Sequence, residues 1–264
     1  MKKYLVIGNP IKHSLSPKLH NYWIKENNIK ATYDKKQLNE NDIEGIISEL
    51  KNNKIDGINV TVPFKKTVIP FLDELTSLAN ETQSVNTVYK EKDKIIGHNT
   101  DVGGFELSLK RIKYDVKNKD VFILGAGGVA PSIILALKKM KASKIILSNR
   151  TKKKAEDLKK IYSDLEIINW GETPNFNMII NATSLGLNKN DEIKLNYTEI
   201  GSNKLFYDVV YNPPQTNFIL KAKQFKNQTE NGKMMFIYQA HQAFTLWHKI
   251  VANIDDKTIN LLNL

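Results

Sequence analysis

Short apolar runs alternate with longer amphipathic stretches along most of the chain. Each run ends at a glycine, a proline or a polar cluster, which is the pattern of buried β-strands. The predicted strands are Tyr4–Ile7, Ala31–Lys36, Gly57–Val60, Val85–Tyr89, Lys94–Gly97, Val121–Leu124, Lys144–Ser148, Met178–Ile180 and Leu205–Asp208. The predicted helices are Pro17–Asn27, Asn41–Lys51, Val102–Ile112, Val129–Met140 and Lys152–Ile161. This alternation predicts an α/β fold with mainly parallel sheets.

The last part of the chain has a different pattern. Apolar residues recur there at steps of three and four, at Ile237, Ala240, Phe244, Trp247 and Val251. This spacing predicts a helix with one apolar face, and we interpret the face as core packing.

The composition excludes several kinds of chemistry. The 264 residues include no cysteine, so disulfides, thiolate catalysis and cysteine-ligated metals are excluded, and a reducing compartment fits. None of the five histidines stands in a metal-binding motif: they are His13, His20, His98, His241 and His248. We therefore expect no metal site.

The charge and the N-terminal residues do not indicate a nucleic-acid or membrane partner. The net charge is +11, but the lysines are scattered, and only Arg111 and Arg150 are arginines. We therefore expect a solvated lysine surface that favours anionic substrates, without nucleic-acid binding. The run Tyr4–Ile7 after Met1-Lys2-Lys3 is too short for a signal peptide, and no stretch is long enough to span a membrane. The expected location is the cytoplasm.

A glycine-rich turn between a strand and a helix is the clearest local sign of a ligand. The run Val121–Leu124 is followed by Gly125-Ala126-Gly127-Gly128-Val129-Ala130, and Pro131 is acceptable in the first turn of the helix that comes next. Gly125 permits a tight turn, Gly127 lets the backbone approach a pyrophosphate, and alanine is an accepted variant at the third glycine position. Amides at the helix start would face the phosphates. This context predicts a dinucleotide site.

The residues after the next strand indicate which dinucleotide binds. Lys144–Ser148 is followed by Asn149-Arg150-Thr151 and then by Lys152, Lys153 and Lys154. An NAD-specific site usually carries Asp or Glu here for the ribose 2′-hydroxyl. A guanidinium, a hydroxyl and several ammonium groups instead attract the 2′-phosphate of NADP. The alternative is a solvated basic helix start, but the pattern favours NADP(H).

Three segments of the N-terminal part carry candidate polar groups, and each also has a purely structural interpretation. Ser16 is a natural N-cap and Pro17 a natural first helical residue, although hydroxyls at a helix start, here with Ser14, also bind carboxylates. Lys65 follows a turn and, taken alone, is most simply a surface lysine. Asp101, taken alone, is most simply an N-cap.

Taken together and in order, the motifs resemble those of the shikimate dehydrogenase family over nearly the whole chain. The matching stretches are Ser14-Leu15-Ser16-Pro17, Asn59–Lys65, Val85-Asn86-Thr87, Asn99-Thr100-Asp101, Gly125–Ala130, Asn149-Arg150-Thr151, Asn181–Gly186, Asp208–Pro213, and Gln239-Ala240 with Phe244 and Trp247. Single motifs are weak, but the ordered set is specific.

The resemblance implies two domains and an activity. Residues 1–100 and 237–264 would form an α/β substrate-binding domain, and residues 101–236 a Rossmann-like NADP-binding domain, with C-terminal helices returning to the first domain. The implied enzyme is an oxidoreductase that reversibly reduces 3-dehydroshikimate to shikimate with NADPH. That reaction belongs to chorismate and aromatic amino-acid biosynthesis.

The resemblance also implies roles for individual residues. Lys65 would be the acid/base group at the C3 oxygen, with Asp101 holding its ammonium. Ser14, Ser16 and Tyr211 would bind the substrate carboxylate. The ring hydroxyls would contact Thr61, Asn86, Asp101 and Gln239, the last preferred to Gln242 by its spacing to Phe244 and Trp247. Cofactor contacts would come from Gly125, Ala126, Gly127, Gly128, Val129, Ala130, Asn149, Arg150, Thr151, Lys154, Thr183, Ser184, Val209, Gly232 and Met235.

Three alternatives stay open beside this interpretation. A related enzyme could also oxidise quinate, with NAD as the alternative cofactor, and an aminoshikimate-type dehydrogenase could use similar domains. A protein that senses NADP would bind the cofactor without turnover, although the retained Lys65 and Asp101 count against it. The oligomeric state is open between a monomer and a homodimer.

Overall fold

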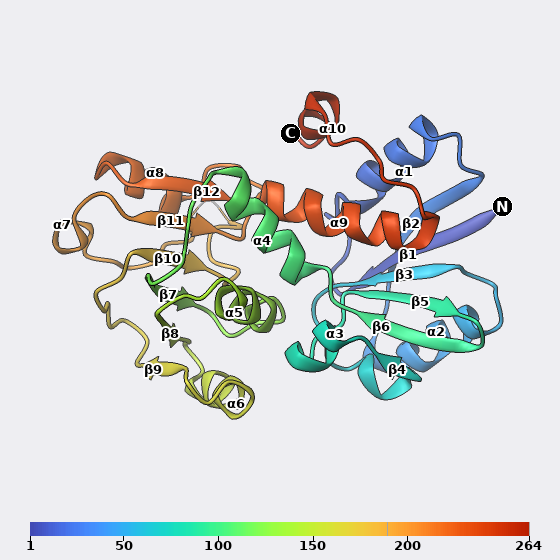
Figure 1. Cartoon of the computed structure of the whole chain (residues 1–264), viewed down its shortest axis with the longest axis horizontal. Coiled ribbons are helices and arrows are strands. Elements are labelled where there is room, and N and C mark those ends of the chain that lie inside the picture. The colour runs from blue at the N-terminus through green and yellow to red at the C-terminus, as the bar shows by residue number, and fades with distance from the viewer. Residues whose placement is uncertain (189, 264) are drawn as a thin grey trace. The chain divides into compact units, whose positions relative to one another are not determined.

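A computed structural model describes residues 1–188 and 190–263, and the chain divides into two compact units. Unit 1 consists of Met1–Gly104 and Ile237–Leu264, and unit 2 of Phe105–Phe236. The chain leaves unit 1 within helix α4 (Asp101–Arg111) and returns to it within α9 (Lys233–His248) (Figure 1). Unit 1 is therefore built from two separate parts of the sequence, and unit 2 from one.

Unit 1 contains a mixed sheet with the strand order β2-β1-β3-β5-β6-β4. The strands are β1 (Lys2–Gly8), β2 (Ala31–Gln37), β3 (Gly57–Val60), β4 (Glu74–Leu75), β5 (Thr87–Glu91) and β6 (Lys94–His98). Strand β1 pairs in parallel with β2 and β3, and β4 pairs in parallel with β6. Strand β5 is antiparallel to β3 and to β6, with which it forms a hairpin.

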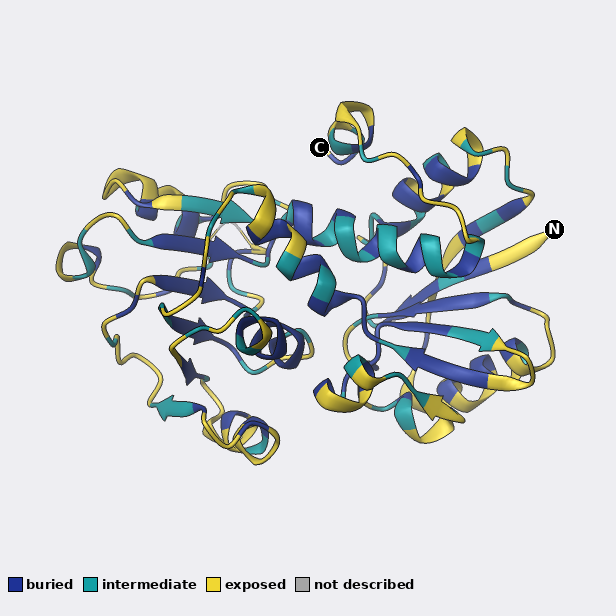
Figure 2. Ribbon diagram, viewed as in Figure 1, coloured by how far each residue is buried: buried dark blue, intermediate teal, exposed yellow. Residues whose placement is uncertain are grey.

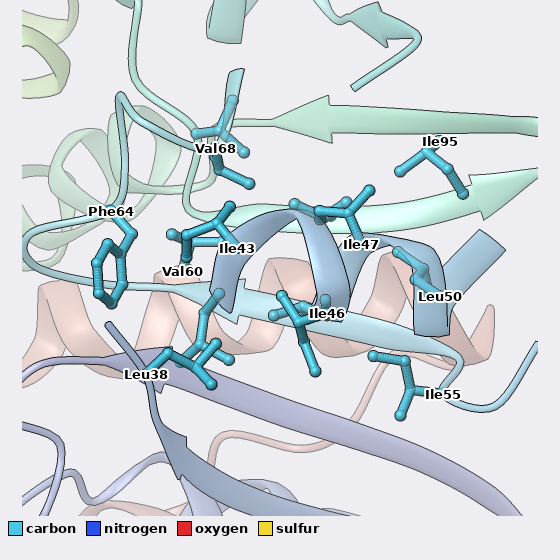
Figure 3. Packing of buried hydrophobic residues seen from close by; sticks show 14 of the residues in the cluster. Leu38, Ile43, Ile46, Ile47, Leu50, Ile55, Val60, Phe64, Val68 and Ile95 are labelled. Atoms are coloured by element: carbon cyan, nitrogen blue, oxygen red, sulfur yellow. The ribbon is translucent and has the colours of Figure 1, made fainter. Parts of the chain in front are cut away.

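Side-chain alternation along the strands gives the sheet of unit 1 two apolar faces. Ile7, Ile58 and Val60 lie in one cluster with the apolar face of α2 (Ile43–Lys51). Figure 3 shows Ile43, Ile46, Ile47 and Leu50 of this helix among the other side chains of the cluster. A helix with this stripe can bury it only against such a sheet face, which explains why α2 forms here.

The opposite face of the same sheet is aromatic. Tyr4 stacks on Trp247 of α9 with 4.9 Å between ring centroids, and Tyr33 stacks on His20 of α1 (Ser16–Glu26) at 4.1 Å. Gly57 leaves the space for Trp247, because a Cβ there would lie 2.5 Å from the indole nitrogen. Helices α1 and α9 therefore cover this face. The predicted C-terminal apolar stripe is core from Ile237 to Trp247, but its last member is wrong, because Val251 lies beyond the end of α9 and is 71% exposed.

Unit 2 contains a wholly parallel sheet with the strand order β12-β11-β10-β7-β8-β9. The strands are β7 (Asp120–Leu124), β8 (Lys144–Ser148), β9 (Glu166–Ile168), β10 (Met178–Asn181), β11 (Leu205–Asp208) and β12 (Gln228–Asn231). Strands β7, β8 and β9 follow one another from the centre to one edge of the sheet, and β10, β11 and β12 follow one another from the centre to the other edge. The strand order therefore reverses between β7 and β10. That arrangement is the doubly wound α/β fold.

Buried strands form the centre of unit 2, as the dark ribbons of Figure 2 show. On one face, Phe122, Ile179 and Phe206 pack against α7 (Tyr197–Ile200) and α8 (Asn217–Gln224). On the other face, Tyr207 packs edge-on against Phe105 and hydrogen bonds to Ser108 of α4. The remaining crossover helices are α5 (Ala130–Lys139) and α6 (Lys152–Ile161).

The structure adds elements that the apolar pattern does not predict. They are β4, β9, β12, α3 (Ser77–Thr82), α7, α8, α10 (Asp256–Asn260) and two single turns of 3₁₀ helix, Glu40–Asp42 and Ile69–Phe71. Strand β5 begins at Thr87, not at Val85. The predicted N-cap at Ser16 is also wrong: α1 begins at Ser16 itself, and the Ser16 amide donates to Ser14 Oγ at 3.4 Å. No helix within the described part of the chain is long and apolar enough to cross a membrane.

Candidate active site

A buried ion pair lies at the centre of the polar residues of unit 1. Lys65 Nζ is 2.5 Å from Asp101 Oδ2, and the two side chains are only 11% and 7% exposed. Lys65 follows β3, and its carbonyl accepts a hydrogen bond from the Val85 amide. Burial of two charges is tolerated only where they are paired and hydrogen bonded. Lys65 is therefore not the solvated surface lysine that it would be by default.

Asn86 extends the pair into a network. Its amide nitrogen lies 3.0 Å from Asp101 Oδ1, 2.8 Å from Thr100 Oγ1 and 3.3 Å from Gln239 Oε1. Its amide oxygen accepts from the Thr100 backbone amide at 2.8 Å. Gln242, one helical turn after Gln239, packs instead against Gly103. Residues from the loop after β6, from α4 and from α9 thus converge on one side chain.

Asn99 fixes the backbone that presents Asp101. Its side-chain oxygen accepts hydrogen bonds from the amides of Asp101 and Val102, and its amide nitrogen donates to Ser84 O and Thr82 Oγ1. Asn99 therefore serves as the cap of α4, and the Asp101 side chain is left to pair with Lys65. The simple interpretation of Asp101 as an N-cap is wrong.

A second chain of hydrogen bonds reaches the same residues from β2. Tyr33 Oη donates to Asn59 Oδ1 at 2.7 Å, and Asn59 Nδ2 donates to Asn86 O and Thr87 Oγ1, both at 3.1 Å. Burial raises the pKa of Tyr33 well above its ordinary value, opposed by a hydrogen bond with Ser16. Ser16, although buried, is therefore linked through Tyr33 to the polar network. Ser14 and Thr61 are half-buried.

The predicted cofactor residues of unit 2 follow one row of the parallel sheet. Leu124 is in register with Ser148 and Asn181, Asn181 with Asp208, and Asp208 with Asn231. The residues that come next in the chain are Gly125, Asn149, Ala182, Val209 and Gly232. They therefore lie together along the carboxyl edge, where ligands of doubly wound sheets bind.

The glycine-rich turn has the shape that a dinucleotide requires. Gly125 has φ = +104°, and a Cβ there would lie 2.8 Å from the Ala182 carbonyl, so no other residue fits without strain. Gly127 and Gly128 are exposed, and a Cβ at Gly127 would meet nothing closer than 3.9 Å, which leaves the turn accessible. Asn149 Oδ1 accepts from the Ala126 amide at 2.9 Å and so ties this turn to the end of β8.

The basic residues beyond β8 face solvent. Arg150, Thr151 and Lys154 are all exposed at the start of α6. Within the described residues, no group of three or more His, Asp and Glu side chains is placed to hold a metal ion. The donor set is thus cationic and hydroxylic, which fits a phosphate ester.

The remaining predicted residues lie on the loops after β10, β11 and β12 and, for Met235, in the first turn of α9. Thr183 is half-buried and Ser184 exposed after β10. Gly232 is in such close contact with the residue after β11 that a Cβ would lie 1.9 Å from Val209 O. Tyr211 stacks on Phe236 with 4.7 Å between ring centroids, and burial raises its pKa to about 12. Met235 is buried.

The fold and these two sets of residues are those of a dinucleotide-dependent dehydrogenase. Residues 6–88 match the model of the shikimate dehydrogenase substrate binding domain, and residues 106–186 that of shikimate / quinate 5-dehydrogenase. A shikimate dehydrogenase (NADP(+)) from Pelagibacter ubique is 60% identical over 263 residues, covering 100% of this chain and 99% of that protein. The chain belongs to the shikimate dehydrogenase family.

Solved structures agree with this assignment. A shikimate dehydrogenase in complex with NADP+ is 31% identical, with a TM-score of 0.92 over 99% of this chain and 94% of that one. The enzyme of Thermus thermophilus, in complex with NADP(H) and shikimate, is 26% identical, with a TM-score of 0.88 over 98% and 97%.

Several residues that support the candidate site were not predicted from the sequence. Asn59, Asn99 and Thr100 stand inside the quoted motifs, so the motifs contain a signal for them. Tyr33 and Asp208 are different, because their partners come from other strands. Only the folded structure brings those partners together.

Proposed function

We propose that this protein is an NADP-dependent shikimate dehydrogenase, which reversibly reduces 3-dehydroshikimate to shikimate on the route to chorismate and the aromatic amino acids. The observation that carries the proposal is the buried Lys65–Asp101 pair, surrounded by Asn86, Thr100 and Gln239. A polyhydroxylated ring acid needs such a set of donors and acceptors beside one group that can exchange a proton.

Lys65 is the acid/base group in this proposal. When bound, NADPH supplies a hydride to the C3 carbonyl carbon of the substrate. The Lys65 ammonium stabilises the negative charge that develops on the C3 oxygen and donates its proton there, which completes the hydroxyl. In the opposite direction, neutral Lys65 accepts that proton. Asp101, at 2.5 Å, keeps the amine oriented.

The other residues of unit 1 select the substrate. Ser14 and Ser16 bind the carboxylate, with Tyr211 of unit 2 assisting. Thr61, Asn86, Asp101 and Gln239 bind ring hydroxyls. The hydrogen bonds that hold Asn86 and Asp101 support these roles, because both side chains are fixed before the substrate arrives. An analogue without a hydroxyl would leave such buried groups unpaired and would bind weakly.

Unit 2 binds NADP(H) along its carboxyl edge in this proposal. The turn at Gly125–Ala130 holds the pyrophosphate, and Asn149, Arg150, Thr151 and Lys154 select the 2′-phosphate. Thr183, Ser184, Val209, Gly232 and Met235 line the way to the nicotinamide. The open turn and the exposed cationic side chains support this assignment.

A spectrophotometric assay tests the function. The purified protein is mixed with shikimate and NADP+ or NAD+, and the absorbance of the reduced nicotinamide is followed; quinate then replaces shikimate. We expect rapid turnover of shikimate with NADP+ and much slower turnover with NAD+ or with quinate. NADPH binding without turnover of shikimate would contradict the substrate assignment and favour the sensing alternative.

We also propose a cellular location and an assembly for the protein. We place the enzyme in the cytoplasm, supported by the absence of cysteine from the sequence and by the metabolic pool of NADPH that the reaction uses. A homodimer is the assembly to test against a monomer, by light scattering during gel filtration. A mass of about one chain, 30.1 kDa, would contradict the dimer.

A further inference from the structure

Asp208, the last residue of β11, is a carboxylate without solvent exposure. Its Oδ1 accepts hydrogen bonds from Asn181 Nδ2 at 2.9 Å and from the Val210 amide at 3.0 Å. Its Oδ2 accepts from Thr216 Oγ1 at 2.5 Å. Burial of a carboxylate costs free energy unless such donors surround it. The chain nevertheless has a carboxylate at this position. The mechanism described above does not use it.

One of the three donors connects Asp208 to the loop after β10. The Asn181 side chain also donates to Leu185 O at 2.8 Å, and its oxygen accepts from Thr183 N and Thr183 Oγ1. Thr183 Oγ1 in turn accepts from the Leu185 amide at 3.0 Å. The conformation of Thr183–Leu185 is therefore determined by Asn181, whose amide is oriented by Asp208.

The other two donors belong to the loop after β11. The Val210 amide and the Thr216 hydroxyl hold the two ends of residues 209–216 onto the same carboxylate. Thr216 also accepts from the Ile219 amide and so caps α8. Gly186 lies against Thr216, because a Cβ there would lie 2.8 Å from Thr216 Cγ2. The two loops thus contact each other next to Asp208.

We propose that Asp208 is a positioning residue that sets the conformation of both loops for the cofactor and for Tyr211. The inference rests on the proposed function, since Thr183, Ser184, Val209 and Tyr211 are the ligand-facing residues of these loops. Asp208 itself is fully buried and so would act through these residues. Its oxygens accept hydrogen bonds from Asn181, which orders the loop after β10, and from Val210 and Thr216 of the loop after the adjacent strand β11.

Replacement by asparagine and by alanine separates positioning from mere packing. In Asp208→Asn the remaining oxygen can still accept from Asn181 and Val210, and the new amide can donate to Thr216 Oγ1. In Asp208→Ala all three donors lose their acceptor. Tyr207→Phe is the matched control, because it removes another buried hydrogen bond, to Ser108 at 2.8 Å, from the adjacent residue of the same strand.

We expect Asp208→Ala to raise the Kd for NADPH at least about tenfold and to lower kcat by a comparable factor, since small misplacements of binding groups are costly. Asp208→Asn should stay within about threefold of the wild type, because all three contacts can be kept. Tyr207→Phe should lower the melting temperature but leave both constants unchanged. If Asp208→Ala does not fold, Thr216→Val, which loses one contact, should raise the Kd about threefold.

Amide hydrogen exchange of the ligand-free protein tests the same inference without any activity. Asp208→Ala, or Thr216→Val in its place, should accelerate exchange at Val210, and Asp208→Ala also at Thr183 and Leu185, whereas Tyr207→Phe should not. If these amides exchange as in the Tyr207→Phe control and NADPH affinity is unchanged, Asp208 is only a packing residue and the inference is wrong. If the wild type does not bind NADPH, the proposed function fails, and the exchange data still decide whether Asp208 orders the loops.

Discussion

Asp208 should also contribute measurably to the pH dependence of the free energy of unfolding. Burial raises its pKa from 3.8 to about 6, opposed by its hydrogen bonds with Thr216, Val210 and Asn181. Asp208 interacts electrostatically with the phenols of Tyr197 and Tyr207, which remain neutral because burial raises their pKa values as well. Between the two pKa values the folded protein binds more protons than the unfolded chain. The stabilising contribution of Asp208 is therefore complete below about pH 3.8 and is lost as the pH rises through about 6.

The magnitude follows from the two pKa values. They differ by about 2.2, which corresponds to about 3 kcal/mol of unfolding free energy at about 1.4 kcal/mol for each pKa unit. Part of this change in unfolding free energy occurs below about pH 4.5, the lowest pH of the experiment described next. Between about pH 4.5 and about pH 7.5, the contribution of Asp208 to the free energy of unfolding falls by about 2 kcal/mol.

Urea unfolding of the wild type and of Asp208→Asn across this range measures the effect. Every other titrating group is shared by the two proteins, so the difference between their unfolding free energies isolates Asp208. We expect this difference to shift by about 2 kcal/mol in favour of Asp208→Asn as the pH rises from about 4.5 to about 7.5. Tyr207→Phe should differ from the wild type by the same amount at every pH. A difference between wild type and Asp208→Asn that is constant with pH would refute the reasoning.

Four substitutions test the rest of the molecule. Lys65→Met should lower kcat by about 10²–10⁴-fold and leave NADPH affinity nearly unchanged, whereas Lys66→Met, at an exposed neighbour, should change neither; joint loss of turnover and affinity would contradict the role of Lys65. Arg150→Asp should weaken NADPH at least about tenfold and NADH little, and equal weakening would contradict the 2′-phosphate assignment. Gly232→Ala would place a Cβ 1.9 Å from Val209 O, and the displacement should lower kcat/KM for NADP+ about 10²-fold; near-normal kinetics would contradict a role for this contact. Gly45→Ala, with nothing within 4 Å of the new Cβ in α2, should stabilise the protein by about 0.5–1 kcal/mol, and a lower melting temperature would contradict this.

Elements with a strong apolar signal were predictable from the sequence. Strands β3, β8 and β11 and helix α6 have the predicted bounds, because each apolar run or amphipathic stretch ends at a clear polar boundary. Strand β12, Gln228–Asn231, has no apolar residue at all and exists because its backbone pairs with β11 at the edge of the sheet. Periodicity cannot detect a strand that is defined only by its neighbour.

The candidate site shows the same division. The residues proposed to meet ligands stand in ordered motifs, so the resemblance could name Lys65, Asp101 and Gln239. Supporting residues such as Tyr33 and Asn59, which lead to Asn86, contact each other across strands that are far apart in the sequence. A polar residue at the end of a strand is also a common feature of turns, and nothing in the sequence separates Asp208 from such a residue.

The two-part construction of unit 1 has a consequence for how the protein is made. Gln239, which contacts Asn86, and Trp247, which covers Tyr4 and Gly57, are translated after the whole of unit 2. While the ribosome is still adding these residues, unit 2 is already a continuous segment, whereas the aromatic face of the first sheet has only α1 to cover it. The emerging chain therefore carries an exposed apolar surface for most of its synthesis, a surface that chaperones bind and that aggregation exploits. A ribosome that stalls before α9 would release a product with its glycine-rich turn complete but its polar network unfinished.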